Sequence, residues 1–333
     1  MKRSIPALVA ASVIAFGGTA TAADKLDLSK YQVTANYAIP TLGEMGLEAS
    51  AVTFAKDRNS LFFVGDEGLG VVELSLTGQV KSTMAFSGWP SRTANNDAEG
   101  LTYLGNGVLV VGEERLQDAF RFTYVPNGSV DLSTVPWSSA FESGYNNNGM
   151  EGFSYDPRNG SFVAVKQSGP QEVRGGSLTF EADLDGGAST MVPLFNASLL
   201  GLLSLSDVQT LSPVDAFSGT PAADNLLILS LGSNKLVESD RSGNVLSQFN
   251  LAGITPNDIE GVTVDHRGII YLIAEDSGFG NSQLIVLTPV PEPAIQALLL
   301  AGLGLVGLRL RRRAQTRRGV HDGGAPDYQL GNG

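Results

Sequence analysis

A short motif recurs along the middle of the chain and limits what the chain can fold into. Each clear copy opens with glutamate and glycine, continues with an apolar residue and a threonine or serine, and leads through a tight turn into a second apolar segment. The clear copies begin at Glu99, Glu151 and Glu260, and weaker copies begin at Ser50 and Gln209. Successive copies are 49, 52, 58 and 51 residues apart. Repeats of about this length, built from short strands, are typical of β-propellers.

The repeat count predicts an all-β propeller of five blades, with six as the alternative. A sixth unit has room in the irregular region 174–206, which falls in the longest interval. The last unit lacks a fourth strand, and residues 31–38 alternate weakly in polarity, so we expect this N-terminal strand to complete the last blade and close the ring. In unit two we expect the fourth strand near residues 128–132. In unit four, residues 212–223 enlarge the first turn.

The composition excludes several kinds of site. The chain has no cysteine and two histidines, so a thiolate metal site, a cysteine nucleophile and a histidine-rich metal site are not expected. The two ends hold eight of the 22 basic residues and three of the 34 acidic ones, so the body carries 14 basic and 31 acidic residues, a formal charge of about −17. This field repels nucleic acid and attracts cations. Solubility alone and a cation-binding role both explain the charge.

The N-terminal segment, residues 1–22, has the features of a secretory signal peptide. Lys2 and Arg3 precede a short, mainly apolar stretch, and small residues end in an A-x-A cleavage pattern. The apolar stretch is short for a membrane anchor. We therefore expect export and a propeller domain over residues 23–289.

The C-terminal segment, residues 290–313, holds a Pro-Glu-Pro triplet, an apolar run over 294–308 and an arginine cluster. It resembles the PEP-CTERM sorting signal of exported Gram-negative proteins, which implies recognition by an exosortase in organisms that make exopolysaccharide. About 15 apolar residues are at the low end for a transmembrane helix, and arginines favour the cytoplasmic side. We expect anchoring at the inner membrane and then release to the surface or medium, with a permanent anchor as the alternative. The polar tail, residues 314–333, is expected to be disordered.

Three segments carry a second resemblance: 97–115, 149–166 and 258–276. Each contains the glutamate–glycine motif and a following strand, and the first and third end in Glu-Arg and Glu-Asp. They resemble the SdiA-regulated (YjiK-like) β-propeller family, which is similar in turn to esterase-like phytase domains. The resemblance covers about residues 47–289. It implies a propeller and possible calcium binding, and it implies no established reaction.

The repeat places acidic residues at one mouth of the central channel. In a propeller, the start of each inner strand and the end of the antiparallel second strand lie on the same face. Asp66 and Asp97 fall in this region, together with a predicted set of metal ligands. That set is Glu99, Glu114, Glu151, Asp207, Glu260 and Glu275. Oxygen ligands at flexible distances suit Ca²⁺. A purely structural motif is the alternative, in which glycine permits a tight entry to the strand and glutamate bonds backbone groups of the next blade.

Three cations near the same mouth are candidates for binding an anionic ligand: Arg92, Arg115 and Lys166. The favoured function is a Ca²⁺-assisted binding or scaffold protein of the envelope, associated with exopolysaccharide and holding a glycan, a small molecule or a protein. The alternative is a Ca²⁺-dependent, phytase-like hydrolase of phosphate esters. Few basic residues in the body disfavour it, because a phosphate substrate needs several. No catalytic residue is identified from the sequence.

Overall fold

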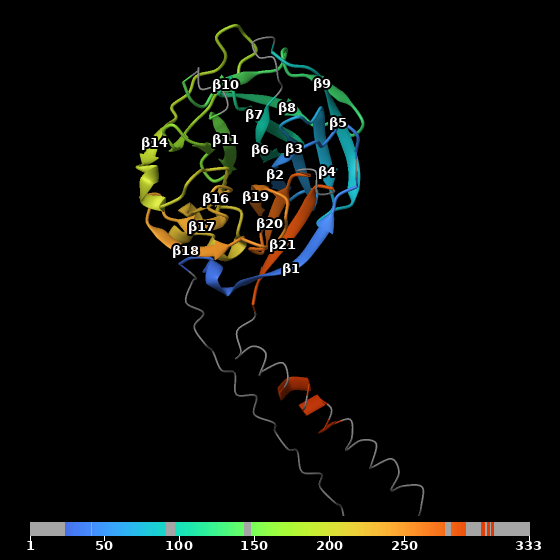
Figure 1. Ribbon diagram of the computed structural model, residues 1–333, viewed down its shortest axis with the longest axis vertical. Coiled ribbons are helices and arrows are strands. Elements are labelled where there is room, and N and C mark those ends of the chain that lie inside the picture. Colours follow the sequence, from blue (N-terminus) through green and yellow to red (C-terminus); the bar gives the residue numbers. More distant parts are fainter. Residues whose placement is uncertain are drawn as a thin grey trace, which may run out of the picture. The chain divides into compact units, whose positions relative to one another are not determined.

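The computed structural model describes residues 24–40, 42–90, 97–142, 148–276, 281–290, 301–303, 305–306 and 308–309. The chain divides into two units at Thr288/Pro289, and the first unit is a five-bladed β-propeller, as Figure 1 shows. Five sheets surround a common axis, and each begins at the axis with its inner strand. The prediction of an all-β propeller with five blades is confirmed, and the region considered for a sixth blade supplies outer strands of the third.

Each blade consists mainly of antiparallel strands, and its first-named strand lies nearest the axis. Blade one has β2 (Ala49–Ala55), β3 (Ser60–Gly65), β4 (Gly70–Leu74) and β5 (Val80–Gly88). Blade two has β6 (Ala98–Gly105), β7 (Val108–Glu113), β8 (Asp118–Thr123) and β10 (Trp137–Ser139). Blade three has β11 (Met150–Asp156), β12 (Ser161–Lys166), β13 (Glu172–Gly176) and β14 (Val192–Phe195). Blade four has β15 (Asp207–Thr210), β16 (Leu226–Ser230), β17 (Lys235–Ser239) and β18 (Val245–Asn250). Blade five has β19 (Ile259–Val264), β20 (Ile270–Ala274), β21 (Gln283–Pro289) and β1 (Tyr31–Ala38).

The core lies between the blades. Five clusters of buried apolar side chains fill the five blade–blade interfaces. Successive side chains of a strand point to opposite faces, so Phe62 packs toward blade two while Phe63 packs toward blade five. Both faces of a blade are buried, which explains why its middle strands read as continuous apolar runs. Among the shorter elements are four 3₁₀ turns: η1 (Leu28–Lys30), η2 (Ala197–Leu200), η3 (Asp215–Phe217) and η4 (Pro221–Asp224).

The N-terminal strand closes the ring, as predicted. β1 pairs with β21 at the outer edge of blade five. The Tyr31 hydroxyl donates to the carbonyl of Gly268 at 2.8 Å, and Leu28 is fully buried between blades four and five. Just before β1, the backbone N–H groups of Leu26 and Asp27 donate to the Glu238 carboxylate of blade four. The start of the described chain therefore joins the last two blades.

The predicted fourth strand of unit two is wrong. Residues 129–131 form β9 (Ser129–Asp131), which pairs in parallel with β5 of blade one, and β10 takes the outer position in blade two. Asn127, in a left-handed conformation, donates its N–H to Thr83 and starts this pairing. β9 covers the otherwise open edge of blade one, a common way to protect an edge strand.

The predicted signal peptide and the predicted C-terminal sorting segment lie largely outside the described residues. Residues 1–22 and 314–333 are not described, and of the predicted apolar span 294–308 only a few helical residues near its end are. Within the described part of the chain, no helix combines the length and apolarity needed to cross a membrane.

Replacing Tyr31 tests the closure by β1. Tyr31→Ala removes a buried ring and its hydrogen bond to Gly268, so we expect a loss of about 3 kcal/mol in the free energy of unfolding, measured by urea titration. Gln32→Ala, at an exposed position of the same strand, is the control and should change it by less than about 0.5 kcal/mol. Equal stability of the two variants would contradict the closing role of β1.

Candidate metal centre at the acidic channel mouth

The glutamate–glycine motif has a steric reason in the inner strands. Adjacent inner strands contact one another around the axis. A Cβ on Gly152 would lie 2.4 Å from the Cα of Asp207, and a Cβ on Gly100 would lie 2.9 Å from the carbonyl oxygen of Glu151. Neither separation is tolerated by backbone atoms, so glycine is required for this approach.

A β-bulge accompanies the motif in four inner strands. The register shifts at the start of β2, β6, β11 and β19. A bulge bends a strand and re-aims the side chain beside it. The side chains of Glu99, Glu151 and Glu260 consequently gather at one mouth of the channel, where Ser50 is the blade-one equivalent.

A ring of polar side chains lies three residues further along the inner strands. The Oγ1 atoms of Thr263, Thr53 and Thr102 accept hydrogen bonds from the backbone N–H of the next blade's strand, at 3.0–3.1 Å. Ser154 continues this series by accepting from Thr210 at 3.0 Å. Gln209 completes the ring, since its Nε2 donates to Ser154 and its Oε1 accepts from Thr263.

This ring corrects the alignment of the fourth repeat. Gln209 occupies the level of Thr102, three residues beyond Glu99, so Ser206 is the blade-four equivalent of the motif glutamate. The sequence alignment of Gln209 with Glu99 is therefore shifted by three residues. The mouth receives a motif glutamate from blades two, three and five only.

Among the described residues, three carboxylates form a group that could hold a metal ion. Asp66 follows β3, Asp97 precedes β6, and Glu99 begins the motif of blade two. One carboxylate oxygen from each lies within 4.8 Å of the others. A Ca²⁺–oxygen distance of 2.3–2.6 Å places two ligands of one ion up to about 5 Å apart, so the spacing and the all-oxygen donor set both fit this ion.

The group is electrostatically unfavourable when fully ionised. Burial and the charges of Glu260 and Asp66 raise the pKa of Glu99 well above its usual range. Burial and the neighbouring Glu48 raise the pKa of Asp66 to about 8, and burial and Glu275 raise the pKa of Glu260 to about 8. Near neutral pH these carboxyl groups must therefore hold protons or share a cation.

Glu114 links this group to blade three. It lies within hydrogen-bonding reach of both Asp97 and Glu151, and its Oε1 accepts from the N–H of Gly149 at 3.0 Å. Burial raises the pKa of Glu114 to about 7, and burial and the charge of Glu99 raise the pKa of Glu151 well above its usual range. Carboxyl groups this close are compatible with a shared proton or a bound cation.

The predicted ligands divide into two groups. Glu99, Glu114, Glu151 and Glu260 interact electrostatically at the mouth, and Glu275 lies beside Glu260. Asp207 lies apart. Its Oδ1 and Oδ2 accept from the N–H groups of Val208 and Val262 at 2.7 Å, so it ties blade four to blade five inside the channel.

The predicted anion-binding cations do not gather as a clamp among the described residues. Arg115 Nη2 is 2.7 Å from Asp97 Oδ2, so it offsets one acidic charge. Lys166 is fully buried, and burial lowers its pKa. Arg92 lies outside the described residues.

Sequence reasoning missed Glu48 and did not count Asp66 or Asp97 as ligands. Glu48 precedes the inner strand of blade one as Asp97 precedes that of blade two. An acidic residue directly before the inner strands of blades one, two and five, at Glu48, Asp97 and Asp258, was the available signal. The weak first repeat concealed it, because Ser50 replaces the motif glutamate there.

Two family models match the chain, and solved structures resemble it at low identity. The family model described as SdiA-regulated matches residues 23–280, and the model of the PEP-CTERM protein-sorting motif matches residues 289–313. Solved structures of low identity include a luciferin-regenerating enzyme, with a TM-score of 0.44 and 12% identity, covering 77% of this chain and 95% of that chain. The β-propeller domain of Myceliophteria thermophila Cps50 (Swd1) has a TM-score of 0.35 and 13% identity, and the match covers 71% of this chain and 67% of that chain. A chain from a nidogen/laminin complex has a TM-score of 0.40 and 12% identity, and the match covers 70% of this chain and 78% of that chain.

Substituting the motif glycine tests its steric role. Gly152→Ala places a methyl group against the Asp207 backbone, and we expect the free energy of unfolding to fall by about 2 kcal/mol or more in urea titration. The control is Gly232→Ala, where the nearest atom to the new Cβ is the Ser204 side-chain hydroxyl at 3.0 Å, so a shift of a few tenths of an ångström relieves the contact. A Gly152→Ala protein as stable as this control would refute the close approach of β11 and β15.

The raised pKa values predict an unusual pH dependence of stability. A carboxyl whose pKa is higher in the folded state than in the unfolded state stabilises the fold at low pH, and this contribution is lost as pH rises through the folded pKa of about 8. In EDTA, the midpoint of thermal unfolding should fall by several degrees between pH 5.5 and pH 8.5. Glu99→Gln combined with Glu260→Gln should reduce this fall in the midpoint. An unchanged fall would contradict the electrostatic repulsion among the carboxyl groups at the mouth.

Proposed function

Because the chain belongs to the SdiA-regulated family and carries a PEP-CTERM sorting motif, we propose that it is an exported envelope propeller that binds Ca²⁺ at its acidic mouth. The sorting motif implies export to the Gram-negative cell envelope and processing by exosortase-type machinery. Signal-peptide removal and transient anchoring at the inner membrane through residues 290–313 complete this route. Released protein would associate with the exopolysaccharide surface as a binding or scaffold module.

One observation carries the calcium assignment: oxygens of Asp66, Asp97 and Glu99 lie within 4.8 Å of one another in a mouth where burial raises carboxyl pKa values. A divalent cation removes the repulsion that otherwise requires protonation. Three carboxylates supply at most six oxygens, and waters or a ligand fill the remaining positions of a six- to eight-coordinate ion. Glu260 and Glu114 surround this set and strengthen the local negative field.

The fully buried Lys166 and the ion pair of Arg115 with Asp97 favour binding over phosphate-ester hydrolysis. A phosphate clamp needs cations that are accessible and uncommitted to other partners. A bound Ca²⁺ would instead offer its open positions to neutral or acidic oxygen donors of a glycan, a small molecule or a partner protein. The calcium site would then link the propeller to the surface matrix.

Calcium titration of thermal unfolding tests the proposal. A ligand that binds only the folded state at 100 times its dissociation constant stabilises it by about 2.7 kcal/mol, which is about 5–10 °C in a domain of this size. We expect a rise of this order when Ca²⁺ is added to EDTA-treated whole protein at pH 7.5. Glu99→Gln combined with Glu260→Gln should abolish most of the rise.

The matched control removes two carboxylates away from the channel, Glu181→Gln with Asp185→Asn, both at exposed positions of blade three. It should retain the full calcium-dependent rise. An absent rise in the unmodified protein, or an equal rise in both double variants, would refute the site. Hydrolysis of 4-nitrophenyl phosphate that depends on Ca²⁺ and on Glu99 would favour the hydrolase instead.

A further inference from the structure

A cavity of about 480 Å³ opens at the end of the channel opposite the acidic mouth. The inner strands run from the acidic mouth toward this cavity, and residues near their ends line it. Contributors from all five blades are Phe54, Tyr103, Tyr155, Gln209 and Val264. The volume falls in the range of sites that enclose small molecules.

The enlarged turn of blade four builds one wall of this cavity. Residues 211–225, between β15 and β16, include the lining residues Ser212, Asp215 and Ser218. Apolar packing holds the segment in place, because Val214 and Phe217 are buried in the core between blades four and five. The enlarged turn of blade four therefore lies at a fixed position beside the cavity.

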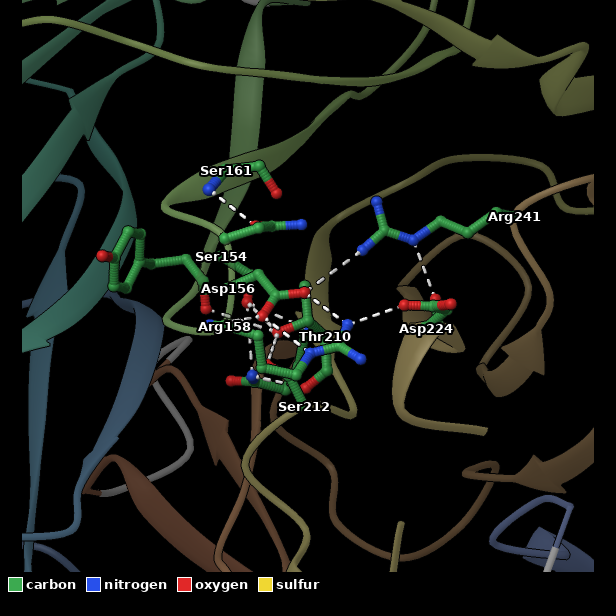
Figure 2. Close-up of polar contacts among 11 residues, drawn as sticks. Ser154, Asp156, Arg158, Ser161, Thr210, Ser212, Asp224 and Arg241 are labelled. Carbon is green, nitrogen blue, oxygen red and sulfur yellow. Dashed lines mark hydrogen bonds and ion pairs between the residues drawn. The ribbon is translucent and has the colours of Figure 1, made fainter. Parts of the chain in front are cut away.

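Polar contacts fasten the same wall at both ends. On one side, Asp215 Oδ1 lies 2.8 Å from Lys56 Nζ of blade one, and the Asp215 N–H donates to the His266 carbonyl of blade five at 2.8 Å. On the other side, Figure 2 shows Arg158 between Asp156 and Asp224, with Nη2 at 2.6 and 2.7 Å from their carboxylates. A wall held at both ends gives a cavity that exists before a ligand enters.

The walls combine aromatic rings with neutral polar groups. Phe54, Tyr103 and Tyr155 come from three different blades. Thr53, Thr102, Gln209 and Thr263 of the polar ring also line the cavity. The hydrogen bonds that Thr53 and Thr102 accept from the backbone use one lone pair of each hydroxyl. Each of these two hydroxyls therefore keeps a proton to donate.

The charged groups of the lining already have partners. Lys56 and Asp215 pair with each other, and the Asp57 carboxylate accepts from the Tyr103 hydroxyl at 2.9 Å and from the Asn106 N–H at 3.1 Å. An anionic ligand would lie near the Asp57 carboxylate, while Lys56, a cation of the lining, is already paired with Asp215. The lining thus favours an uncharged ligand with apolar faces and several hydroxyl groups.

We propose that this cavity binds an uncharged saccharide of one or two sugar rings. The C–H faces of a sugar pack on aromatic rings, while its hydroxyl groups exchange hydrogen bonds with threonine and serine side chains. The site is independent of the calcium site, because the two lie at opposite mouths and share no residue. The propeller would then hold a sugar unit at one end and a cation at the other.

Titration of the whole protein with neutral sugars tests the assignment. The probes are glucose, N-acetylglucosamine, maltose and cellobiose, followed by saturation-transfer NMR and calorimetry. At least one should bind with a dissociation constant on the order of 1 mM, as suits a ligand of this size. Glucuronate, which carries a negative charge, should bind at least about tenfold more weakly than glucose.

Ser218→Trp fills the cavity from an exposed loop position and should weaken sugar binding at least about tenfold. The matched control Ser218→Ala should leave sugar binding unchanged. Tyr155→Leu, which keeps apolar volume and removes the aromatic face, is a second variant, and thermal unfolding verifies that each variant is folded. Glu99→Gln with Glu260→Gln should leave sugar binding unchanged. The proposal is overturned if none of the four neutral sugars binds at 20 mM. It is also overturned if both cavity variants bind normally, if the acidic-mouth variant loses binding, or if glucuronate binds as well as glucose.

Discussion

The close approach of neighbouring inner strands is the contact on which the channel depends. Motif glycines allow β6, β11 and β19 to come near the next strand, and the ring of hydroxyl groups satisfies backbone N–H groups that would otherwise be left unpaired in the interior. β6 and β11 also carry a glutamate at one end and a tyrosine at the other. One steric requirement, repeated from blade to blade, therefore fixes the geometry of both mouths.

Counterions decide what burial does to a carboxylate in this fold. Glu73 is buried in blade one, yet hydrogen bonds from Arg58, Ser60 and Lys81 outweigh the effect of burial and lower its pKa to about 2. At the channel mouth, burial acts on carboxylates whose main neighbours are other carboxylates, and the pKa of Asp66 rises to about 8. The first arrangement is an internal ion pair that is complete as it stands. The carboxylates at the channel mouth carry an excess of negative charge, which favours binding of an external cation.

The two mouths suit different ligands because the chain provides them with different chemistry. Acidic residues before and at the start of the inner strands form a hard-oxygen site, while the last residues of these strands and the insertion after β15 present aromatic rings and hydroxyl groups. The insertion after β15 adds a wall to the second mouth only. Under the proposals above, one end would hold a cation and the other a sugar unit.

Sequence alone determined the repeat, the strands and turns of most blades, the closing role of residues 31–38 and the face on which the acidic residues gather. These features follow from local alternation, turn residues and a constant interval, which a linear pattern records directly. Only the tertiary structure decided that β9 joins blade one, that Gln209 belongs to the polar ring, that Asp207 bonds backbone groups across blades, and that the insertion of blade four walls a cavity. Each of these depends on contacts between residues far apart in the chain, where register and close packing select among alternatives that local sequence leaves equal.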